Sequence, residues 1–218
     1  VVNNGSYSFM RDTALPTIGM LKRDDTKVRV PKKVKEIFEK HMLDTQDHLY
    51  NHPCIIAYTI FNEGWGQFES DRMYALAKET DSTRLYDSTS GWFWQNDSDF
   101  DSYHVYFGDK KPQPDKRPML ISEFGGCTYV VPGHIYAKYN SYGYGNCRDE
   151  QELSEKIAEK YEELIIPVVK AGACGCVYTQ LSDVEDEVNG FYTYDRKVCK
   201  VDPEKMRKLA DKIQKELM

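Results

Sequence analysis

The sequence predicts an α/β fold built from parallel βα units. Apolar runs, typical of strands buried on both faces, stop abruptly at polar residues followed by glycine. Segments with helical spacing alternate with these runs. We expect five strands, roughly over residues 54–61, 84–89, 101–107, 118–122 and 173–180. Parallel strands of this kind form either a barrel or a doubly wound sheet, and both folds place their chemistry at the carboxyl ends of the strands.

The composition argues against several classes of function. A net charge of -6 on 218 residues offers no basic patch for a nucleic-acid backbone. No apolar run approaches the roughly 20 residues of a membrane span, and the first residues lack the features of a signal peptide. The six cysteines show no zinc-module spacing, so we expect structural thiols, a reducing compartment and a cytoplasmic location. A chain that starts without methionine is expected to be a piece of a longer protein.

The first predicted strand ends at a carboxylate. Residues 1–30 have no sustained period and predict a loop. Apolar residues at helical spacing behind Pro31, which suits a first helical turn, predict an amphipathic helix over 32–50. This helix leads into the first strand, whose apolar run stops at Asn62 and Glu63. Glu63 is therefore the first candidate for catalysis.

Aromatic residues follow the second predicted strand. A helix over 68–80 comes first, and the strand over 84–89 ends just before Trp92 and Trp94. Two roles are open for these rings. They can pack in the core, or they can form a platform on which a sugar ring stacks.

A later strand also ends at a glutamate. The run over 118–122 is followed by Glu123 and then by two glycines, which let the backbone turn tightly. Two strand-end glutamates indicate one reaction. The glycine-rich stretch over 124–149 is too long for a simple connection, and we expect it to form a lid over the pocket.

The last third of the chain predicts a helix, a strand and a second helix. The first helix covers 151–170, and its apolar face comprises Leu153, Ile157, Tyr161, Leu164, Ile165 and Val168. An acidic loop follows the strand over 173–180, and Asp202 with Pro203 opens the final helix. Strands and helices therefore keep alternating to the end of the sequence.

Three motifs lie on or beside these strands in a fixed order: Asn62-Glu63 after Asn51-His52-Pro53; Ser122-Glu123-Phe124-Gly125; and Thr179-Gln180 to Asn189-Gly190 with Tyr194-Asp195-Arg196. Together they resemble glycoside hydrolase family 2, the group of β-galactosidases, β-glucuronidases and β-mannosidases. The resemblance runs over nearly the whole chain. Asn-Glu alone is a weak signal, whereas the ordered set is specific.

The resemblance implies an incomplete (β/α)8 TIM barrel, of which the five strands are strands four to eight. A complete barrel usually needs about 250 residues. Residues 1–218 would be the C-terminal portion of the catalytic barrel, with βα units over 31–218. An open barrel exposes strand edges, so we expect the chain to pair with a second copy or with the missing N-terminal half of the same enzyme.

The resemblance also implies the two catalytic roles. Glu123 would be the nucleophile of a retaining, double-displacement mechanism, and Glu63 would be the general acid and then the general base. Asn62 would bind the 2-hydroxyl group of the sugar.

Further substrate contacts are expected around these glutamates. Alternation along the 101–107 strand sends His104 and Tyr106 to the same face, and the resemblance favours that face as the one that meets the substrate. A core pair without such a role is the alternative. Gln180, at the end of the last strand, completes the expected set of substrate-binding residues together with the two tryptophans.

The expected activity is hydrolysis of terminal β-linked sugars, with galactosides first and mannosides second. The region Val188–Phe191 lacks the lysine with which the family's glucuronidases read the substrate carboxylate, which argues against glucuronides. No cofactor is expected, and paired acids need no metal. The main alternative is a catalytically silent carbohydrate-binding or structural fragment, and a metal-dependent hydrolase is a weaker third hypothesis.

Overall fold

The structure is a computed structural model that describes residues 24–64, 66–106, 111–136 and 141–217. Most of the loop expected over 1–30 lies outside the described residues. The chain divides into two compact units. The N-terminal unit runs to Tyr103 and includes Asp115–Pro118, and the C-terminal unit comprises His104–Pro114 and the chain from Met119 onward.

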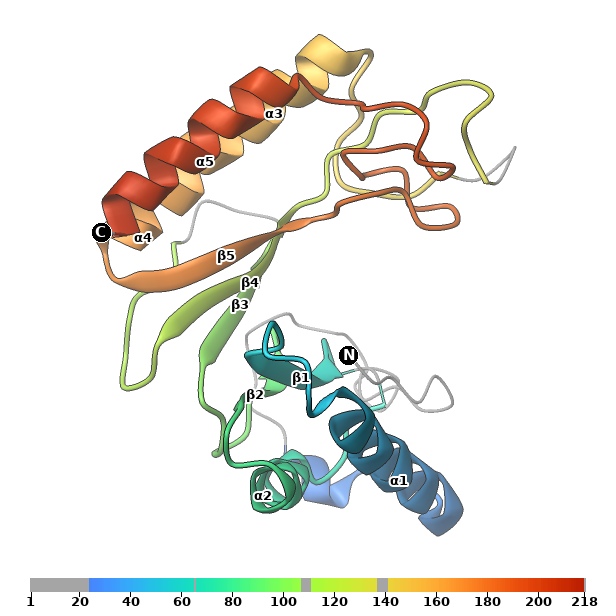
Figure 1. Cartoon of the computed structure of the whole chain (residues 1–218), viewed down its shortest axis with the longest axis vertical. Helices are drawn as coiled ribbons and strands as arrows, with labels where there is room; N and C mark the ends of the chain where they lie inside the picture. Colours follow the sequence, from blue (N-terminus) through green and yellow to red (C-terminus); the bar gives the residue numbers. More distant parts are fainter. Residues whose placement is uncertain (1–23, 65, 107–110, 137–140, 218) are drawn as a thin grey trace. The chain divides into compact units, whose positions relative to one another are not determined.

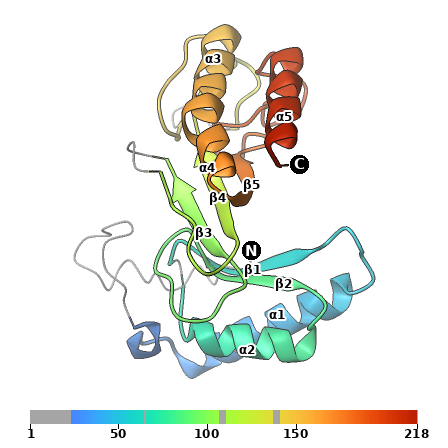
Figure 2. The same ribbon diagram turned by 90° about the vertical axis from the view of Figure 1, so that its left-hand side faces the viewer.

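The N-terminal unit packs two helices on a two-stranded parallel sheet. Its elements are α1 (Lys32–Leu49), β1 (Ala57–Asn62), α2 (Ser70–Thr80) and β2 (Leu85–Ser90). Figures 1 and 2 both show α1 and α2 together on one side of β1 and β2. The core between these layers is rich in aromatic rings, including Phe38, Phe61, Phe68 and Tyr86. The helix, strand, helix and strand expected for this part of the sequence are therefore confirmed.

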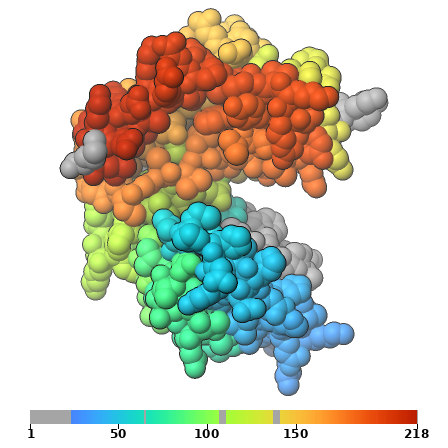
Figure 3. Space-filling model, in the orientation of Figure 1, coloured from blue at the N-terminus to red at the C-terminus, as the bar shows by residue number. Residues whose placement is uncertain are grey.

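The C-terminal unit covers a three-stranded sheet with helices. The strands are β3 (Asp101–Val105), β4 (Met119–Gly125) and β5 (Ala173–Thr179), in the spatial order β3-β4-β5, and β4 and β5 are parallel. The helices α3 (Glu150–Lys160), α4 (Ile166–Lys170) and α5 (Pro203–Leu217) lie on one face of this sheet. The boundary between the two units falls within β3. In the space-filling view the red atoms of α5 form part of the outer surface of this unit (Figure 3).

The helix expected over 151–170 is continuous but contains a π-helical turn. This turn, Tyr161–Ile165, joins α3 directly to α4. Leu153, Ile157, Ile165 and Val168 are buried as expected, whereas Tyr161 and Leu164 are only half-buried and Ile166 is buried in addition. A π turn has a wider repeat than an α turn, so it rotates the residues that follow relative to those that precede it. A strict period of 3.6 therefore misplaced Leu164 and missed Ile166, although Ile165 and Val168 lie on the buried face as predicted.

The five strands fall into two sheets among the described residues, rather than one continuous curved sheet. In the N-terminal unit, side chains join β2 to the first residues of β3. The Ser102 hydroxyl donates a hydrogen bond to Asp87 Oδ1 (2.9 Å), and both side chains are buried. The parallel βα units are confirmed, and the complete barrel to which they would belong stays a prediction. None of the described helices is both long enough and apolar enough to cross a membrane.

A buried ion pair organises the loop that follows β5. The ammonium of Lys200 donates to Asp183 Oδ1 (2.7 Å) and to the carbonyl of Val188 (2.9 Å), and both charged side chains are almost fully buried. The backbone N–H of Gly190 donates to the same Asp183 oxygen (2.8 Å). Loss of hydration raises the pKa of Asp183 and lowers that of Lys200, and the attraction between the two opposes both shifts.

We expect the Lys200→Met substitution to lower the free energy of unfolding by about 3–5 kcal/mol, because it leaves the Asp183 carboxylate buried without its counter-ion. The measurement is urea denaturation of the full chain. Lys197→Met is the matched control, since this lysine lies in the same segment and is exposed, and it should change stability by less than about 0.5 kcal/mol. In the double variant with Asp183→Asn, much of the loss should be recovered. Equal effects of the two lysine substitutions would contradict this account.

Candidate active site

Glu63 directly follows β1 and has an unusual backbone conformation. Its backbone N–H donates to the carbonyl of Ser90 at the end of β2 (3.0 Å), and its φ of 55° is left-handed. Non-glycine residues rarely adopt this region, and such strain, of about 1–3 kcal/mol, concentrates at functional sites. Asn62, the last residue of β1, is paired with Ser90 in the parallel register. The two residues thus lie at the carboxyl ends of paired strands, as expected.

The two tryptophans lie beyond β2 in the same unit. Trp92 is buried in a small cluster with Val28 and Phe93. The indole N–H of Trp94 donates to the carbonyl of Ser102 (2.9 Å), and its ring packs edge-on against Tyr103. These contacts agree with the packing role that the sequence left open. A role in stacking a sugar stays a prediction.

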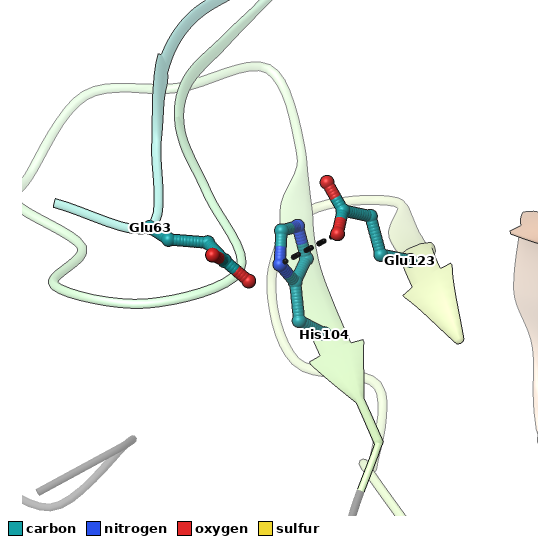
Figure 4. Close-up of side chains that lie close together, drawn as sticks. All are labelled: Glu63, His104 and Glu123. Atoms are coloured by element: carbon teal, nitrogen blue, oxygen red, sulfur yellow. Dashed lines mark ion pairs between the residues drawn. The ribbon is translucent and has the colours of Figure 1, made fainter. Parts of the chain in front are cut away.

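Glu123 lies inside β4 rather than after it, because β4 continues to Gly125. Two of its neighbours are His104, which belongs to β3, and Tyr106, which directly follows β3. The Tyr106 hydroxyl donates a hydrogen bond to Glu123 Oε2, and His104 Nδ1 lies 3.4 Å from the same oxygen. Figure 4 shows the His104 and Glu123 side chains directed toward one another, and it also labels Glu63 of the N-terminal unit. The alternation predicted along β3 therefore brings both His104 and Tyr106 to Glu123.

Burial makes this contact stronger than its geometry alone suggests. The His104 side chain is fully buried, and the Glu123 side chain is 26% exposed. Hydrogen bonds to a carboxylate favour its ionised form, and a charge-assisted bond is about twice as strong as a neutral one. An ionised, oriented carboxylate that still reaches solvent can act as a nucleophile or as a base.

The hydrogen bonds continue from β4 to β5 and to the loop beyond it. The Tyr106 hydroxyl also forms a hydrogen bond with Thr179 Oγ1 (3.1 Å) at the end of β5. The next residue, Gln180, donates from its amide to Glu187 Oε2 (3.0 Å) and to Asn189 Oδ1 (2.8 Å). Gln180 is thus held beside the group that contacts Glu123, although its contact with substrate is still a prediction.

Within the C-terminal unit, His104 Nδ1 and Glu123 Oε2 are the two atoms of this contact that could bind a metal ion. One imidazole and one carboxylate supply two of the three or four protein ligands that a zinc site uses. Tyr106 already donates to the carboxylate oxygen that faces the imidazole. Within the C-terminal unit the contact is thus a hydrogen bond from Tyr106 to Glu123 beside an imidazole–carboxylate pair.

Tyr144 is a residue of this site that the sequence reasoning missed. Its ring lies on the ring of Tyr106, with 4.3 Å between the centroids, and its backbone N–H donates to the carbonyl of Gly126 (2.7 Å). It belongs to the glycine-rich stretch for which we expected a lid. The Tyr-Gly-Tyr-Gly sequence that begins at Tyr142 was the available signal, because glycines beside an aromatic ring allow the backbone to approach closely.

No known family profile matches the sequence, and no curated protein matches it. Solved structures do match. The β-D-glucuronidase of Dictyoglomus thermophilum has 14% identity and a TM-score of 0.59, over 88% of this chain and 37% of that one. An FMN-binding β-glucuronidase of Faecalibacterium prausnitzii L2-6 has 19% identity and a TM-score of 0.54, over 79% and 31% of the respective chains.

A Bacteroides fragilis protein provisionally named a β-galactosidase also matches. It has 14% identity and a TM-score of 0.55, over 81% of this chain and 31% of its own. The resemblance seen in the sequence motifs is thus matched by a likeness in fold to glycosidases. This chain spans less than two fifths of the length of each of these three neighbours.

We expect the Gly126→Ala substitution to destabilise the C-terminal unit more than Gly133→Ala does. Both glycines have positive φ, 72° and 85°, so both variants incur the backbone penalty of about 1–2 kcal/mol. A Cβ at Gly126 would lie 2.5 Å from Tyr144 Cδ2, whereas one at Gly133 meets nothing within 4 Å. The clash should add about 1–3 kcal/mol. Urea denaturation of both variants measures the difference, and equal losses would show that the Tyr144 stack is not tightly packed.

Proposed function

We propose that this chain forms part of the catalytic domain of a retaining glycoside hydrolase that removes terminal β-linked sugars. The observation that carries the proposal is the placement of Glu123 on β4, with a hydrogen bond from Tyr106 and with His104 of the adjacent strand β3 at 3.4 Å from the same oxygen. The fold likeness to glycosidases supports it. In this proposal the chain supplies the later strands of a (β/α)8 barrel, whose catalytic groups gather at the carboxyl ends of the strands.

In the first step, the carboxylate of Glu123 attacks the anomeric carbon, and the bond from that carbon to the leaving oxygen breaks. Glu63 donates its proton to the leaving oxygen, and a glycosyl-enzyme ester forms. In the second step, Glu63 takes a proton from water, and the resulting nucleophile displaces Glu123 from the anomeric carbon. Each step inverts the configuration at the anomeric carbon, so the product has the same configuration as the substrate. Such a mechanism requires about 5–5.5 Å between the two carboxyl groups.

The local structure around each glutamate suits its proposed role. Donation from Tyr106 keeps Glu123 ionised and aims the lone pairs of its second oxygen. The left-handed backbone at Glu63 directs its side chain away from the course of β1. Asn62 precedes the acid and would bind the 2-hydroxyl group, an interaction that strengthens as positive charge develops on the sugar.

We propose β-galactosides as the first substrate class and β-mannosides as the second. Two of the three neighbours described above are named β-glucuronidases, which brings glucuronides into the comparison. In this chain, however, Asn189 is buried and its side-chain oxygen accepts from Gln180. No lysine occurs in the segment Val188–Phe191 to pair with a uronic acid carboxylate. A neutral sugar therefore fits the described residues better.

A second candidate function is sugar binding without turnover. The observation that favours it is the length of the chain, which spans 37% or less of these three neighbours. In that case the chain would need a second copy, or the N-terminal half of the same enzyme, to complete a working barrel. Sugar binding without hydrolysis, by this chain and by a longer version alike, would favour this candidate.

The experiment replaces each glutamate with glycine and adds azide, using 4-nitrophenyl β-D-galactopyranoside as substrate. Without azide, Glu123→Gly should lose on the order of 1,000-fold or more in kcat/KM, because it removes the nucleophile of the first step. Glu63→Gly should lower mainly kcat, because 4-nitrophenolate leaves with little help from an acid, whereas hydrolysis of the glycosyl-enzyme ester needs the base. With azide, Glu123→Gly should give the α-galactosyl azide, since azide replaces the nucleophile on the opposite face. Glu63→Gly should give the β-galactosyl azide, since azide then attacks the glycosyl-enzyme ester.

Glu159→Gln serves as the control, because Glu159 is an exposed residue of α3. It should retain the activity of the unaltered chain. Identical azide products from the two glycine variants, or no loss of activity in either, would contradict the assigned roles. The same assay with β-mannoside and β-glucuronide substrates ranks the three sugar classes.

A further inference from the structure

An aromatic surface leads outward from the partner of Glu123. The ring of Tyr144 packs on that of Tyr106 at a tilt of 35°, and the ring of Tyr142 packs edge-on against Tyr144 with 5.7 Å between centroids. The hydroxyl groups of Tyr142 and Tyr144 are hydrogen-bonded (3.1 Å). Tyr142 is 51% exposed. Three tyrosines of the C-terminal unit thus form a continuous series of ring contacts from the Glu123 carboxylate to the surface.

This surface is held in place by the backbone on both sides. The N–H of Tyr142 donates to the carbonyl of Asp186 (2.6 Å), and its carbonyl accepts from Val188 (3.1 Å). Gly143 lies so close to the chain that a Cβ there would be 2.2 Å from Thr128 Cγ2. The rings are therefore ordered before any ligand arrives. Ordered aromatic rings lose little conformational entropy on binding.

Polar groups flank the rings. Tyr142 and Glu187 are paired in an isolated parallel β-bridge. The half-buried Glu187 carboxylate accepts from Gln180, whose amide also bonds Asn189. A carboxylate and amides beside an exposed aromatic face match a sugar ring, which has an apolar face and hydroxyl groups around its edge. An aryl or alkyl leaving group would contact the rings but would form no hydrogen bonds with the polar groups.

We propose that Tyr142 and Tyr144, with Glu187 and Gln180, form a subsite for the sugar on the leaving-group side of the scissile bond. The substrate would then be a β-linked disaccharide or oligosaccharide. The proposal rests on the function proposed above and deepens it. In the function proposed above, a terminal sugar lies against the partly exposed Glu123 carboxylate, so the rest of the substrate must extend from there toward solvent. The tyrosine series extends in this direction, from Tyr106 to the exposed ring.

The test measures binding to the full chain carrying Glu123→Gln, which prevents turnover. The probes are lactose, cellobiose and β-1,4-mannobiose, each compared with the methyl β-glycoside of its non-reducing sugar, by calorimetry or saturation-transfer NMR. At least one disaccharide should bind fivefold or more tightly than its methyl glycoside. Adding Tyr142→Ala should abolish that difference, whereas Tyr142→Phe, which retains the ring, should keep most of it.

Tyr136→Ala is the matched control, because Tyr136 is also an exposed tyrosine of the C-terminal unit, at 58%. It should leave disaccharide binding unchanged. Urea denaturation and near-UV circular dichroism of each variant establish that it is folded. Glu187→Gln provides an independent variant, and it should weaken the disaccharide more than the methyl glycoside.

The proposal is overturned if no disaccharide binds more tightly than its methyl glycoside. It is also overturned if the folded Tyr142→Ala variant keeps the difference. These outcomes are separate from failure of the hydrolase assignment, which the azide products decide. Hydrolysis with correct azide products and no effect of Tyr142→Ala would remove the subsite alone. Disaccharide binding that depends on Tyr142, without hydrolysis, would remove the catalytic assignment alone.

Discussion

The hydrogen bond between Tyr106 and Glu123 is the interaction on which the C-terminal unit depends most. It crosses from β3 to β4, and the contact of the same hydroxyl with Thr179 reaches the end of β5. A carboxylate set within a strand would be unfavourable there without such a donor, because burial disfavours its charge. The hydroxyl offsets that penalty, and it also fixes the direction in which the carboxylate faces. The hydrogen bond from Tyr106 thus determines both where the Glu123 carboxylate lies and how it can react.

The local elements followed from the sequence because their signals are local. Continuous apolar runs and helical spacing gave α1, α2, α5 and the positions of the strands to within a few residues. The two-residue period of β3 also placed His104 and Tyr106 on the face that meets Glu123. These properties depend on neighbours in the sequence. They are therefore visible without the fold.

Other features depend on partners that are distant in the sequence. The strand containing Glu123 was expected to end before this residue, since a glutamate normally marks the end of an apolar run. It continues to Gly125 because Tyr106, 17 residues earlier, satisfies the carboxylate. The packing of Tyr144 on Tyr106 and the burial of Lys200 beside Asp183 also depend on residues that are distant in the sequence. Each requires a loop conformation that no periodicity specifies.

The π-helical turn between α3 and α4 affects how this unit could change over evolution. The helix buries Leu153 and Ile157 before the turn, and Ile166 and Val169 after it. An α-helix advances about 100° per residue, and the turn contributes one residue beyond the regular repeat. Because the π turn absorbs this residue, deleting one residue here would restore a continuous α repeat and keep both halves of the apolar face toward the sheet. A deletion elsewhere in the helix would instead turn one half of that face away.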